Sequence, residues 1–267
     1  MEQLIERAAR NLVDSKYAIA LTGAGISTES GIPDFRGPSG VWTKNPDAEK
    51  KAYRSYQRFQ EDPKGWWEER LSGPSILGDI EKAMPNSGHY ALAELEKHGI
   101  LKCVITQNVD ALHEKAGTKN LLEYHGNLLK LRCVSCTSRF GQEAFDLEKL
   151  RSEDQLPPHC PKCGGIVKTD GVSFGEPIPR DVAHQSLEKA RKCDLMLICG
   201  TSAVVYPFAE LPIIAKQSKG DTIIEFNAEP TLLTKEQISD YLIQGKTGEI
   251  LPKLVEEVKK IMKNETA

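Results

Sequence analysis

Four of the seven cysteines form two closely spaced pairs that could hold a metal ion. Cys133 and Cys136 make one C-x2-C pair, and Cys160 and Cys163 make the second. Each pair can place two thiolates on one ion, and two pairs complete the tetrahedral ligand set of a structural zinc site. A redox C-x2-C motif occurs once and opens a helix, whereas both pairs here lie in loop-like sequence. The sequence therefore predicts one structural zinc ion.

A glycine-rich turn after the first apolar run could cradle a phosphate. Gly23 and Gly25 follow residues 17–21, as the turn between a strand and a nucleotide-binding helix requires. The third glycine of a G-x-G-x-x-G fingerprint would stand at position 28, where the chain has Thr28. Two interpretations stay open at this point. The protein is either a dehydrogenase with an altered fingerprint or a protein that binds a dinucleotide for another purpose.

Polar or glycine-rich stretches also follow three further apolar runs, at residues 101–106, 194–199 and 222–226. The residues in these stretches are Gln107, Asn108, Asp110, Gly200, Thr201, Ser202, Asn227 and Glu229. Ligands of open α/β sheets gather at the carboxyl ends of the strands. Small hydroxyl residues suit contacts with phosphate or ribose, and the last two suit ribose hydroxyls. Together with the glycine turn, these strand ends predict a dinucleotide site.

His125 is the best candidate for an acid–base group. A lone histidine is more often a structural residue, but this one lies in a polar break, beside Gly126 and just before the cysteine pairs. It therefore falls at the junction of two parts of the chain, where sites tend to form. An imidazole with a pKa near 6.5 is the natural proton acceptor at neutral pH.

The elements that must position these residues indicate an α/β fold. Strand-like apolar runs alternate with stretches of helical period at residues 2–14, 87–98, 181–192, 207–218 and 249–263. Such alternation predicts a Rossmann-like parallel sheet with helices on both faces.

Two stretches interrupt this alternation and predict a smaller domain. Residues 39–85 are rich in charged and aromatic residues and predict a helical module, and residues 127–170 hold the cysteine pairs and predict a zinc-ribbon module. The discontinuous nucleotide-binding domain would then comprise residues 1–38, 86–126 and 171–267.

Composition narrows the class of protein. The chain has 267 residues, 39% of them hydrophobic and 27% charged, with a formal net charge of −3. This charge gives no field that would attract nucleic acid or an anionic membrane. No apolar run approaches the roughly 20 residues that cross a bilayer. The charged, amphipathic start lacks the apolar core of a signal peptide, so we expect a cytoplasmic protein. The oligomeric state is not predicted.

Eight motifs, taken in order, resemble those of the sirtuins of the prokaryotic type, which are NAD-dependent protein lysine deacylases. They are GAGIS at 23–27, GIPDFRG at 31–37, QNVDALH at 107–113, the pair at 125–126, the two C-x2-C pairs, FGEP at 174–177, GTS at 200–202 and NAE at 227–229. The resemblance covers nearly the whole chain. It implies that NAD is consumed as a co-substrate, without hydride transfer.

The resemblance also implies roles for individual residues. Asn108 and Asp110 would lie against the nicotinamide ribose and carboxamide, and His125 would be the general base that removes a ribose hydroxyl proton. The products would be free lysine, nicotinamide and O-acyl-ADP-ribose. Further NAD contacts are implied at Gly23, Ala24, Gly25, Ser27, Asp34, Phe35, Arg36, Trp42 and Thr247. Of these, Asp34, Phe35 and Arg36 would form a loop over the nicotinamide end, and Thr247 would touch the adenine end.

An acetyl-lysine protein or peptide is the partner that the resemblance implies. It would bind in the cleft between the domains, at Val172, Phe174, Gly175 and Glu176. An extended peptide could add as a strand there, although the same residues would also suit a plain linking turn. Sirtuins that prefer succinyl- or malonyl-lysine carry a Tyr-x-x-Arg pair, and the corresponding positions here are Arg70 and Gly73. Plain deacetylation is therefore predicted, with longer apolar acyl groups also accommodated.

The chain departs from the family pattern at two places. The family usually has glycine after the Asp of its Gln-Asn-x-Asp motif, where this chain has Ala111. It usually has Pro-Asp before the FGEP motif, where this chain has Thr169-Asp170. Two alternative functions remain: an ADP-ribosyltransferase, and a non-catalytic module that senses NAD or ADP-ribose.

Overall fold

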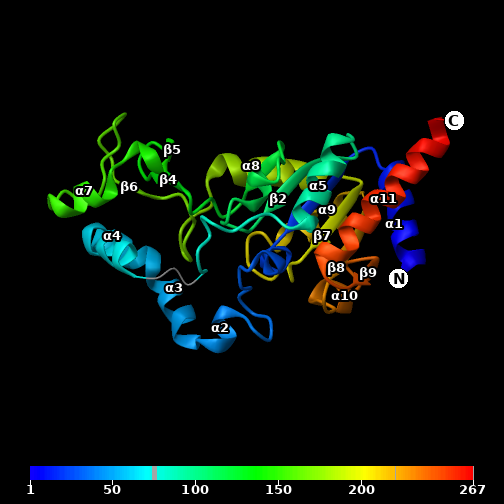
Figure 1. The fold of residues 1–267 in the computed structure, drawn as a ribbon, viewed down its shortest axis with the longest axis horizontal. Helices are drawn as coiled ribbons and strands as arrows, with labels where there is room; N and C mark the ends of the chain where they lie inside the picture. The colour runs from blue at the N-terminus through cyan, green and yellow to red at the C-terminus, as the bar shows by residue number, and fades with distance from the viewer. Residues whose placement is uncertain (74–76, 220, 267) are drawn as a thin grey trace.

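The computed structural model describes residues 1–73, 77–219 and 221–266, and Figure 1 shows a larger and a smaller part. Residues 74–76 of the predicted helical module, and residues 220 and 267 of the predicted nucleotide-binding domain, lie outside the described residues. Both chain termini lie on the larger part, at the end remote from the smaller one.

A six-stranded, all-parallel sheet forms the centre of the larger part. Its strands are β1 (Ala18–Thr22), β2 (Leu101–Thr106), β3 (Leu121–Glu123), β7 (Leu195–Cys199), β8 (Thr222–Asn227) and β9 (Tyr241–Gln244). They lie in the order β3-β2-β1-β7-β8-β9, which is the doubly wound order of dinucleotide-binding sheets. The chain switches direction between β1 and β7, so their carboxyl ends open the crevice. The predicted Rossmann-like sheet is confirmed, and the short edge strands β3 and β9 were not predicted.

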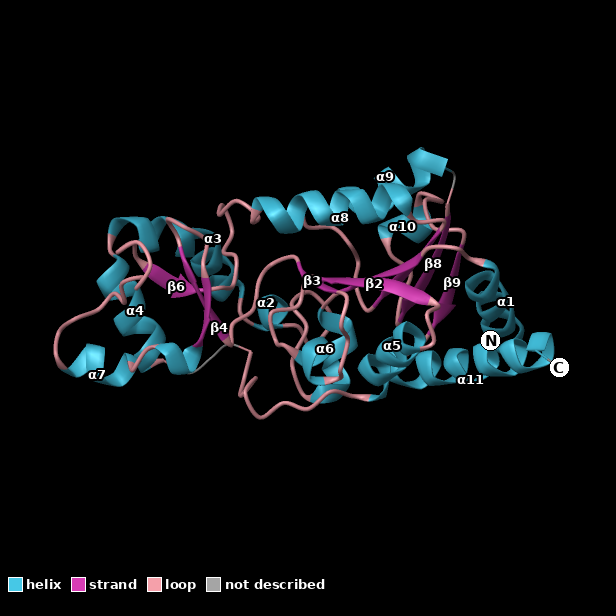
Figure 2. Cartoon of the chain, turned by 90° about the horizontal axis from the view of Figure 1, so that it is seen from above, coloured by secondary structure: helices cyan, strands magenta, loops and turns pink. Residues whose placement is uncertain are grey.

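Helices cover both faces of this sheet, as Figure 2 shows. One face carries α1 (Glu2–Asp14), α5 (Ser87–Lys97) and α11 (Thr247–Thr266), and the other carries α8 (Arg180–Lys192) and α9 (Glu210–Lys219). Helix α1 shows why they pack: Ile5, Ala8, Ala9 and Leu12 recur at helical spacing and are all buried. With both faces covered, a central strand such as β1 is apolar and buried at every position. Short helices η1 (Ala24–Ser30), α6 (Leu112–Lys115) and α10 (Leu232–Lys235) follow strand ends.

The smaller part combines helices with a three-stranded antiparallel sheet. The helices are α2 (Val41–Lys44), α3 (Pro46–Glu61), α4 (Pro63–Ser72), η2 (Gln142–Ala144) and α7 (Leu147–Ser152), and the sheet has the order β5 (Arg139–Gly141), β4 (Lys130–Cys133), β6 (Val167–Thr169). Trp67 of α4 joins the two, because its ring is buried and its Nε1 donates to the carbonyl oxygen of Val167 at 2.9 Å. The exact domain boundaries stay a prediction.

The start of α11 is hydrogen-bonded to the first residue of α5 and to η1. Pro252 lies inside the helix and has no N–H to donate to the carbonyl of Gly248. The hydroxyl of Ser87 donates to that carbonyl instead, at 2.6 Å. The N–H of Gly248 donates to Glu29 of η1 at 2.8 Å. The first turn of α11, with Thr247, is thereby fixed beside the glycine turn after β1.

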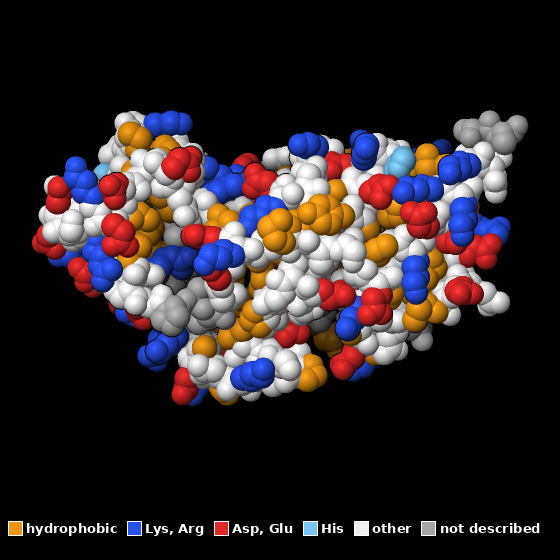
Figure 3. Space-filling view, viewed as in Figure 1, with side chains coloured by type: hydrophobic (Ala, Val, Ile, Leu, Met, Phe, Trp, Pro, Cys, Tyr) orange, Lys and Arg blue, Asp and Glu red, His pale blue; other side chains and the backbone are white. Residues whose placement is uncertain are grey.

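Charged groups are spread over the surface. On the face drawn in Figure 3, acidic and basic side chains are interspersed over both parts. The net charge of −3 is therefore not concentrated in one acidic field on that face. Within the described part of the chain, no helix has the length and apolar character that a membrane span needs.

Candidate active site and zinc centre

A cavity of about 1680 Å³ opens at the carboxyl ends of the parallel strands and extends to the smaller part. It brings together residues that lie far apart in the sequence. The predicted NAD contacts in its wall are Ala24, Gly25, Ser27, Asp34, Phe35, Arg36, Trp42, Gln107, Asn108, Asp110, Gly200, Thr201, Ser202, Asn227, Glu229 and Thr247. The same wall contains His125, Val172, Phe174, Gly175 and Glu176. Gly23 lies behind it, where its carbonyl accepts a hydrogen bond from Asn108 Nδ2 at 3.1 Å.

The glycine turns after β1 and β7 are in direct backbone contact. The N–H of Gly25 donates to the carbonyl of Gly200 at 2.8 Å, and a Cβ on Gly25 would lie only 2.7 Å from that oxygen. A Cβ on Gly23 would lie 2.6 Å from Thr201 Cβ. Gly200 itself has φ +61°, a left-handed conformation that glycine adopts without strain. Close packing of two turns therefore explains glycine at these positions.

The structure fits a dinucleotide at this cavity. The two glycine turns meet at the switch point of the sheet, where such cofactors bind in open α/β folds. At the other end, the hydroxyl of Thr247 is buried, has no hydrogen-bond partner and belongs to a residue of the cavity wall. A buried hydroxyl without a partner is costly unless a ligand or water satisfies it.

Ser27, Asn108 and Asp110 form a buried polar cluster in the wall of the cavity. Ser27 Oγ donates to Asp110 Oδ2 at 2.7 Å, and Asn108 Nδ2 donates to Ser27 Oγ at 3.0 Å. Asp110 Oδ1 accepts from the N–H of Leu112 at 2.9 Å. Burial raises the pKa of Asp110, and the hydrogen bonds from the N–H of Leu112 and the hydroxyl of Ser27 oppose that shift. The cluster fixes the side chains of the strand end after β2 in one arrangement.

Asn227 is held by its protein neighbours. Its Oδ1 accepts from the N–H of Thr201 at 2.9 Å, and its Nδ2 donates to Glu225 at 3.1 Å. Glu225 is fully buried and also accepts from the hydroxyls of Thr231 and Ser239, each at 2.6 Å. The amide of Asn227 thus shapes the turn at Thr201, and its contact with a ribose stays a prediction.

His125 lies half-buried in the cavity wall, against the rings of Tyr124 and Phe208 at 5.6 and 6.4 Å between centroids. Burial lowers the pKa of His125 to about 4, while a hydrogen bond with the backbone of Gln107 acts in the opposite direction. The imidazole is therefore neutral at neutral pH and has a free electron pair for a proton. The position of His125 in the cavity wall and its neutral imidazole both suit a general base.

An aromatic cluster connects the predicted nicotinamide loop to the predicted substrate residues. The ring of Trp42 lies 4.7 Å from that of Phe35 and 5.6 Å from that of Phe174. Tyr53 also packs against Phe174, with 4.4 Å between the ring centroids, and the guanidinium of Arg36 lies 4.5 Å from the centroid of the Trp42 ring. Residues 34–36 and 174 therefore share one wall of the cavity. Tyr53 was not predicted, because nothing in the sequence places α3 beside Phe174.

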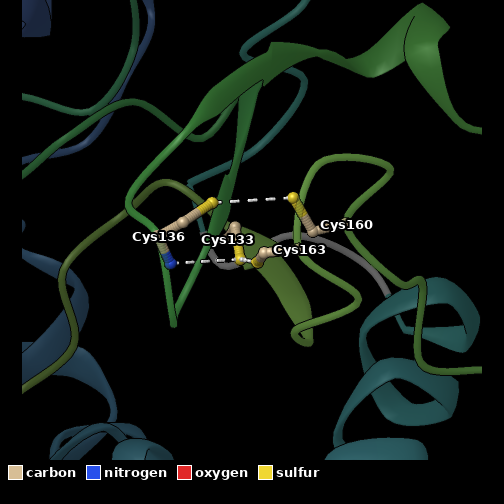
Figure 4. A group of neighbouring side chains, drawn as sticks. All are labelled: Cys133, Cys136, Cys160 and Cys163. Carbon is tan, nitrogen blue, oxygen red and sulfur yellow. Dashed lines mark hydrogen bonds between the residues drawn. The ribbon is translucent and has the colours of Figure 1, made fainter.

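The four cysteines converge in the smaller part, as Figure 4 shows. Their Sγ atoms all lie within 4.8 Å of one another, with Cys133 and Cys163 at 3.5 Å and Cys136 and Cys160 at 3.7 Å. These separations match the sulfur–sulfur distance of about 3.8 Å that a tetrahedral Zn–S length of about 2.3 Å requires. They are much longer than a disulfide bond of about 2.05 Å. The thiolate set fits one structural zinc ion.

The carboxylate of Glu176, a predicted substrate contact, is engaged by other side chains of the protein. Its side chain is 6% exposed, and it pairs with Arg132 at 2.8 Å and Lys168 at 3.1 Å. Arg132 precedes a zinc ligand and Lys168 lies on β6, and the sequence alone gave no signal for either residue. Contact of Glu176 with substrate stays a prediction.

Comparison with known proteins gives one consistent result. A family model described as the Sir2 family matches residues 23–207. An NAD-dependent protein deacylase of Pyrococcus abyssi is 45% identical over 260 residues, which are 97% of this chain and 100% of the relative. NAD-dependent protein deacylase 2 of Archaeoglobus fulgidus is 46% identical over 262 residues, 98% of each chain.

Solved structures agree with the sequence matches. A Sir2 homologue variant in complex with ADP-ribose superimposes with a TM-score of 0.79 at 41% identity, over 97% of this chain and 98% of the other. A Sir2 variant with a deacetylated p53 peptide and 3′-O-acetyl-ADP-ribose gives a TM-score of 0.78 at 34% identity, over 95% and 98%.

Proposed function

The chain belongs to the Sir2 family, and from this premise we propose that it is an NAD-dependent protein lysine deacetylase. The observation that carries the proposal is that the glycine turns, His125 and residues 172–176 line one and the same cavity. A nucleotide and an acyl-lysine peptide bound there would meet at the histidine. When bound, NAD supplies the ribose that accepts the acetyl group, with release of nicotinamide.

The nucleotide end of the cavity is preorganised for binding. The backbone turns at Gly25 and Gly200 would hold the diphosphate, and the Thr247 hydroxyl would contact the adenine end. Asn108 and Asp110 would face the nicotinamide ribose, and their buried cluster with Ser27 keeps them in place. Fixed donors and acceptors of this kind require little reorganisation on binding.

His125 would act as the general base. Its lowered pKa keeps the imidazole neutral, so it can take a proton from a ribose hydroxyl without first losing one. The aromatic cluster of Phe35, Trp42 and Phe174 would cover the nicotinamide end and exclude water. The substrate is an acyl-lysine protein or peptide, and we propose acetyl-lysine because no Tyr-x-x-Arg pair is present at Arg70 and Gly73. A cytoplasmic location, expected from the sequence, stays a prediction.

The test is mass spectrometry of an acetyl-lysine peptide incubated with NAD. The unmodified protein should yield free lysine and O-acetyl-ADP-ribose, and His125→Ala should lower the yield by about 10² to 10⁴-fold. His184→Ala is the matched control, because the His184 side chain is 72% exposed and lies on α8.

Two results would contradict the proposal. Consumption of NAD without deacetylation would favour ADP-ribosyl transfer, and binding of intact NAD with every acyl chain untouched would favour a sensor. The same assay with a succinyl-lysine peptide tests the acyl preference. Turnover of that peptide above the acetyl peptide at matched concentration would exclude plain deacetylation as the main activity.

A further inference from the structure

The segment of residues 171–176, here called the substrate segment, is anchored to the three-stranded zinc sheet by buried charged side chains. Lys168 on β6 and Asp170 directly after it have side chains that are 1% exposed. Arg132 on β4 and Glu176 at the end of the segment are 8% and 6% exposed. Charges this deeply buried are costly unless each is paired, so their arrangement constrains the backbone around them.

All three ammonium protons of Lys168 have partners, and two of these partners lie in the substrate segment. Its Nζ donates to the carbonyl of Thr169 at 2.8 Å and to the carbonyl of Gly171 at 2.6 Å, and it pairs with Glu176 Oε2 at 3.1 Å. The ammonium group therefore joins the beginning of the substrate segment to its end. An ammonium has three donors and no acceptor, so none is left for another partner.

Glu176 closes the segment from the other side. Its Oε1 accepts from Arg132 Nη2 at 2.8 Å, and its Oε2 accepts from the N–H of Ser173 at 3.0 Å. Arg132 also pairs through Nε with Asp170 Oδ1 at 3.0 Å. Both carboxylate oxygens of Glu176 are thus engaged within the protein. Arg132 precedes the zinc ligand Cys133 in the chain, so the network begins at the metal centre.

We propose that Lys168 and Glu176 are positioning residues, which transmit the shape of the zinc sheet to the substrate segment and thereby set the affinity for the acyl peptide. This inference rests on the proposed deacetylase function. The nucleotide end of the cavity is built from strand ends of the larger sheet and takes no part in the network. Loss of one charge should therefore weaken peptide binding selectively. A purely structural role would instead weaken peptide and nucleotide binding together.

The test compares Lys168→Met with Lys168→Arg, which keeps the charge, and with Lys64→Met. Lys64 forms an exposed pair with Asp154 that also links α4 to the zinc module, so it is a matched control. In Lys168→Met we expect the amide hydrogens of Val172 and Ser173 to exchange about tenfold faster or more, since a lost charge-assisted hydrogen bond corresponds to at least that factor. The peptide KM should rise by a similar factor, with the NAD KM and kcat within about twofold. One bound zinc ion should remain.

Lys168→Arg should recover most of the peptide affinity, and Lys64→Met should behave as the unmodified protein. If Lys168→Met does not fold, Glu176→Gln takes its place, because it keeps the side-chain volume, removes the charge and replaces one acceptor oxygen by an NH2 group. Because Glu176 is itself a predicted substrate contact, hydrogen exchange at Ser173, whose N–H donates to Glu176, is then the deciding measurement. Equal increases of the peptide and NAD KM would overturn the inference. So would unchanged exchange at Val172 and Ser173, or unfolding with zinc loss in both variants.

Failure of the proposed function would look different. Hydrogen exchange, zinc content and ADP-ribose binding need no turnover. If the unmodified protein does not deacetylate, while Lys168→Met loosens the substrate segment and leaves ADP-ribose binding intact, the deacetylase proposal is wrong and the anchoring of the segment stands. If the protein deacetylates and the segment stays unchanged in the variant, the positioning role is wrong.

Discussion

The backbone N–H of Val172 donates a 2.7 Å hydrogen bond to the carbonyl oxygen of His125. The candidate base and the substrate segment are therefore joined by the main chain itself. Gly126 permits this approach, because it has φ +72° and a Cβ there would lie 2.0 Å from the carbonyl oxygen of Asp170. The glycine beside the histidine thus serves backbone packing between the larger sheet and the zinc module.

The charge state of His125 predicts an unusual pH profile. An ordinary histidine base would lose its function as the pH falls through 6.5, but burial lowers the pKa of His125 to about 4. We expect kcat/KM to persist below pH 6.5 and to fall only as the imidazole takes up a proton near the lower value. Initial rates after a rapid pH jump, before any unfolding, measure this. An acid limb centred at 6.5 would contradict it.

Buried histidines also predict acid lability of the fold. Burial lowers the pKa of His89 to about 4 and that of His113 well below 6.5. Between 6.5 and the lowered values, the unfolded chain binds protons that the folded chain does not, so stability falls as the pH falls. Each group contributes up to about 1.4 kcal/mol per pH unit in that window. Urea unfolding of the unmodified protein and His89→Gln across this range measures it.

The free energy of unfolding of His89→Gln should depend less steeply on pH than that of the unmodified protein. The difference in slope should be up to about 1.4 kcal/mol per pH unit. His184→Gln is the control, since the His184 side chain is 72% exposed and should leave the slope unchanged. Identical slopes in all three proteins would mean that other groups dominate the acid response.

Zinc removal should act through the smaller part of the molecule. The four cysteines hold the turns that flank β4 and β6, and those strands carry Arg132 and Lys168. A chelator should therefore inactivate slowly, in step with metal release, and added NAD should not protect. Parallel records of activity, released zinc and near-ultraviolet circular dichroism follow this. Immediate inhibition that NAD relieves would instead place the metal near the nucleotide.

The sequence could predict those parts of the site that lie next to strong local signals. Each of the strands β1, β2, β7 and β8 is an apolar run with a polar or glycine stretch after it, and the rule for strand ends then brings the four stretches together. The cysteine spacing was sufficient for the zinc centre in the same way. Strand β3 has three half-buried residues and β9 has four residues, of which only Ile243 is buried, so their apolar pattern is too short to recognise.

Long-range polar contacts could not be predicted. Glu176 stands two residues after Phe174 in the FGEP motif, but its carboxylate lies toward Arg132 and Lys168 because these charges are buried and need a partner. Likewise the amide of Asn227 is used by Thr201, a pairing set by the order of β7 and β8 in the sheet. Such pairings depend on which elements become neighbours, which residue spacing does not encode.

Gly25→Ala should disrupt the nucleotide end of the cavity. The added Cβ would lie 2.7 Å from the carbonyl oxygen of Gly200, so the two turns must separate. We expect ADP-ribose affinity to fall about tenfold or more, with a loss of stability of about 1–3 kcal/mol from overpacking. Titration calorimetry with ADP-ribose measures the first effect. Unchanged affinity would mean that the turns do not hold the diphosphate.

The control for this prediction is Gly99→Ala. Gly99 has φ +71° with no atom near its Cβ position and lies between α5 and β2, away from the cavity. It should lose about 1–2 kcal/mol of stability from left-handed strain alone. Its ADP-ribose affinity should stay unchanged, which separates instability from a defect in the site.

Ala111→Gly should stabilise the protein. Ala111 has φ +61° and ψ 10°, a left-handed conformation that costs a residue with a Cβ about 1–2 kcal/mol. Glycine adopts it freely, although its greater freedom in the unfolded chain offsets part of the gain, so we expect a net increase of about 0.5–1 kcal/mol in urea unfolding. Ala116→Gly is the control at the other end of α6, because Ala116 has φ −74° and should lose stability. If both variants lost the same amount of stability, left-handed strain at Ala111 would not explain why the family usually has glycine at this position.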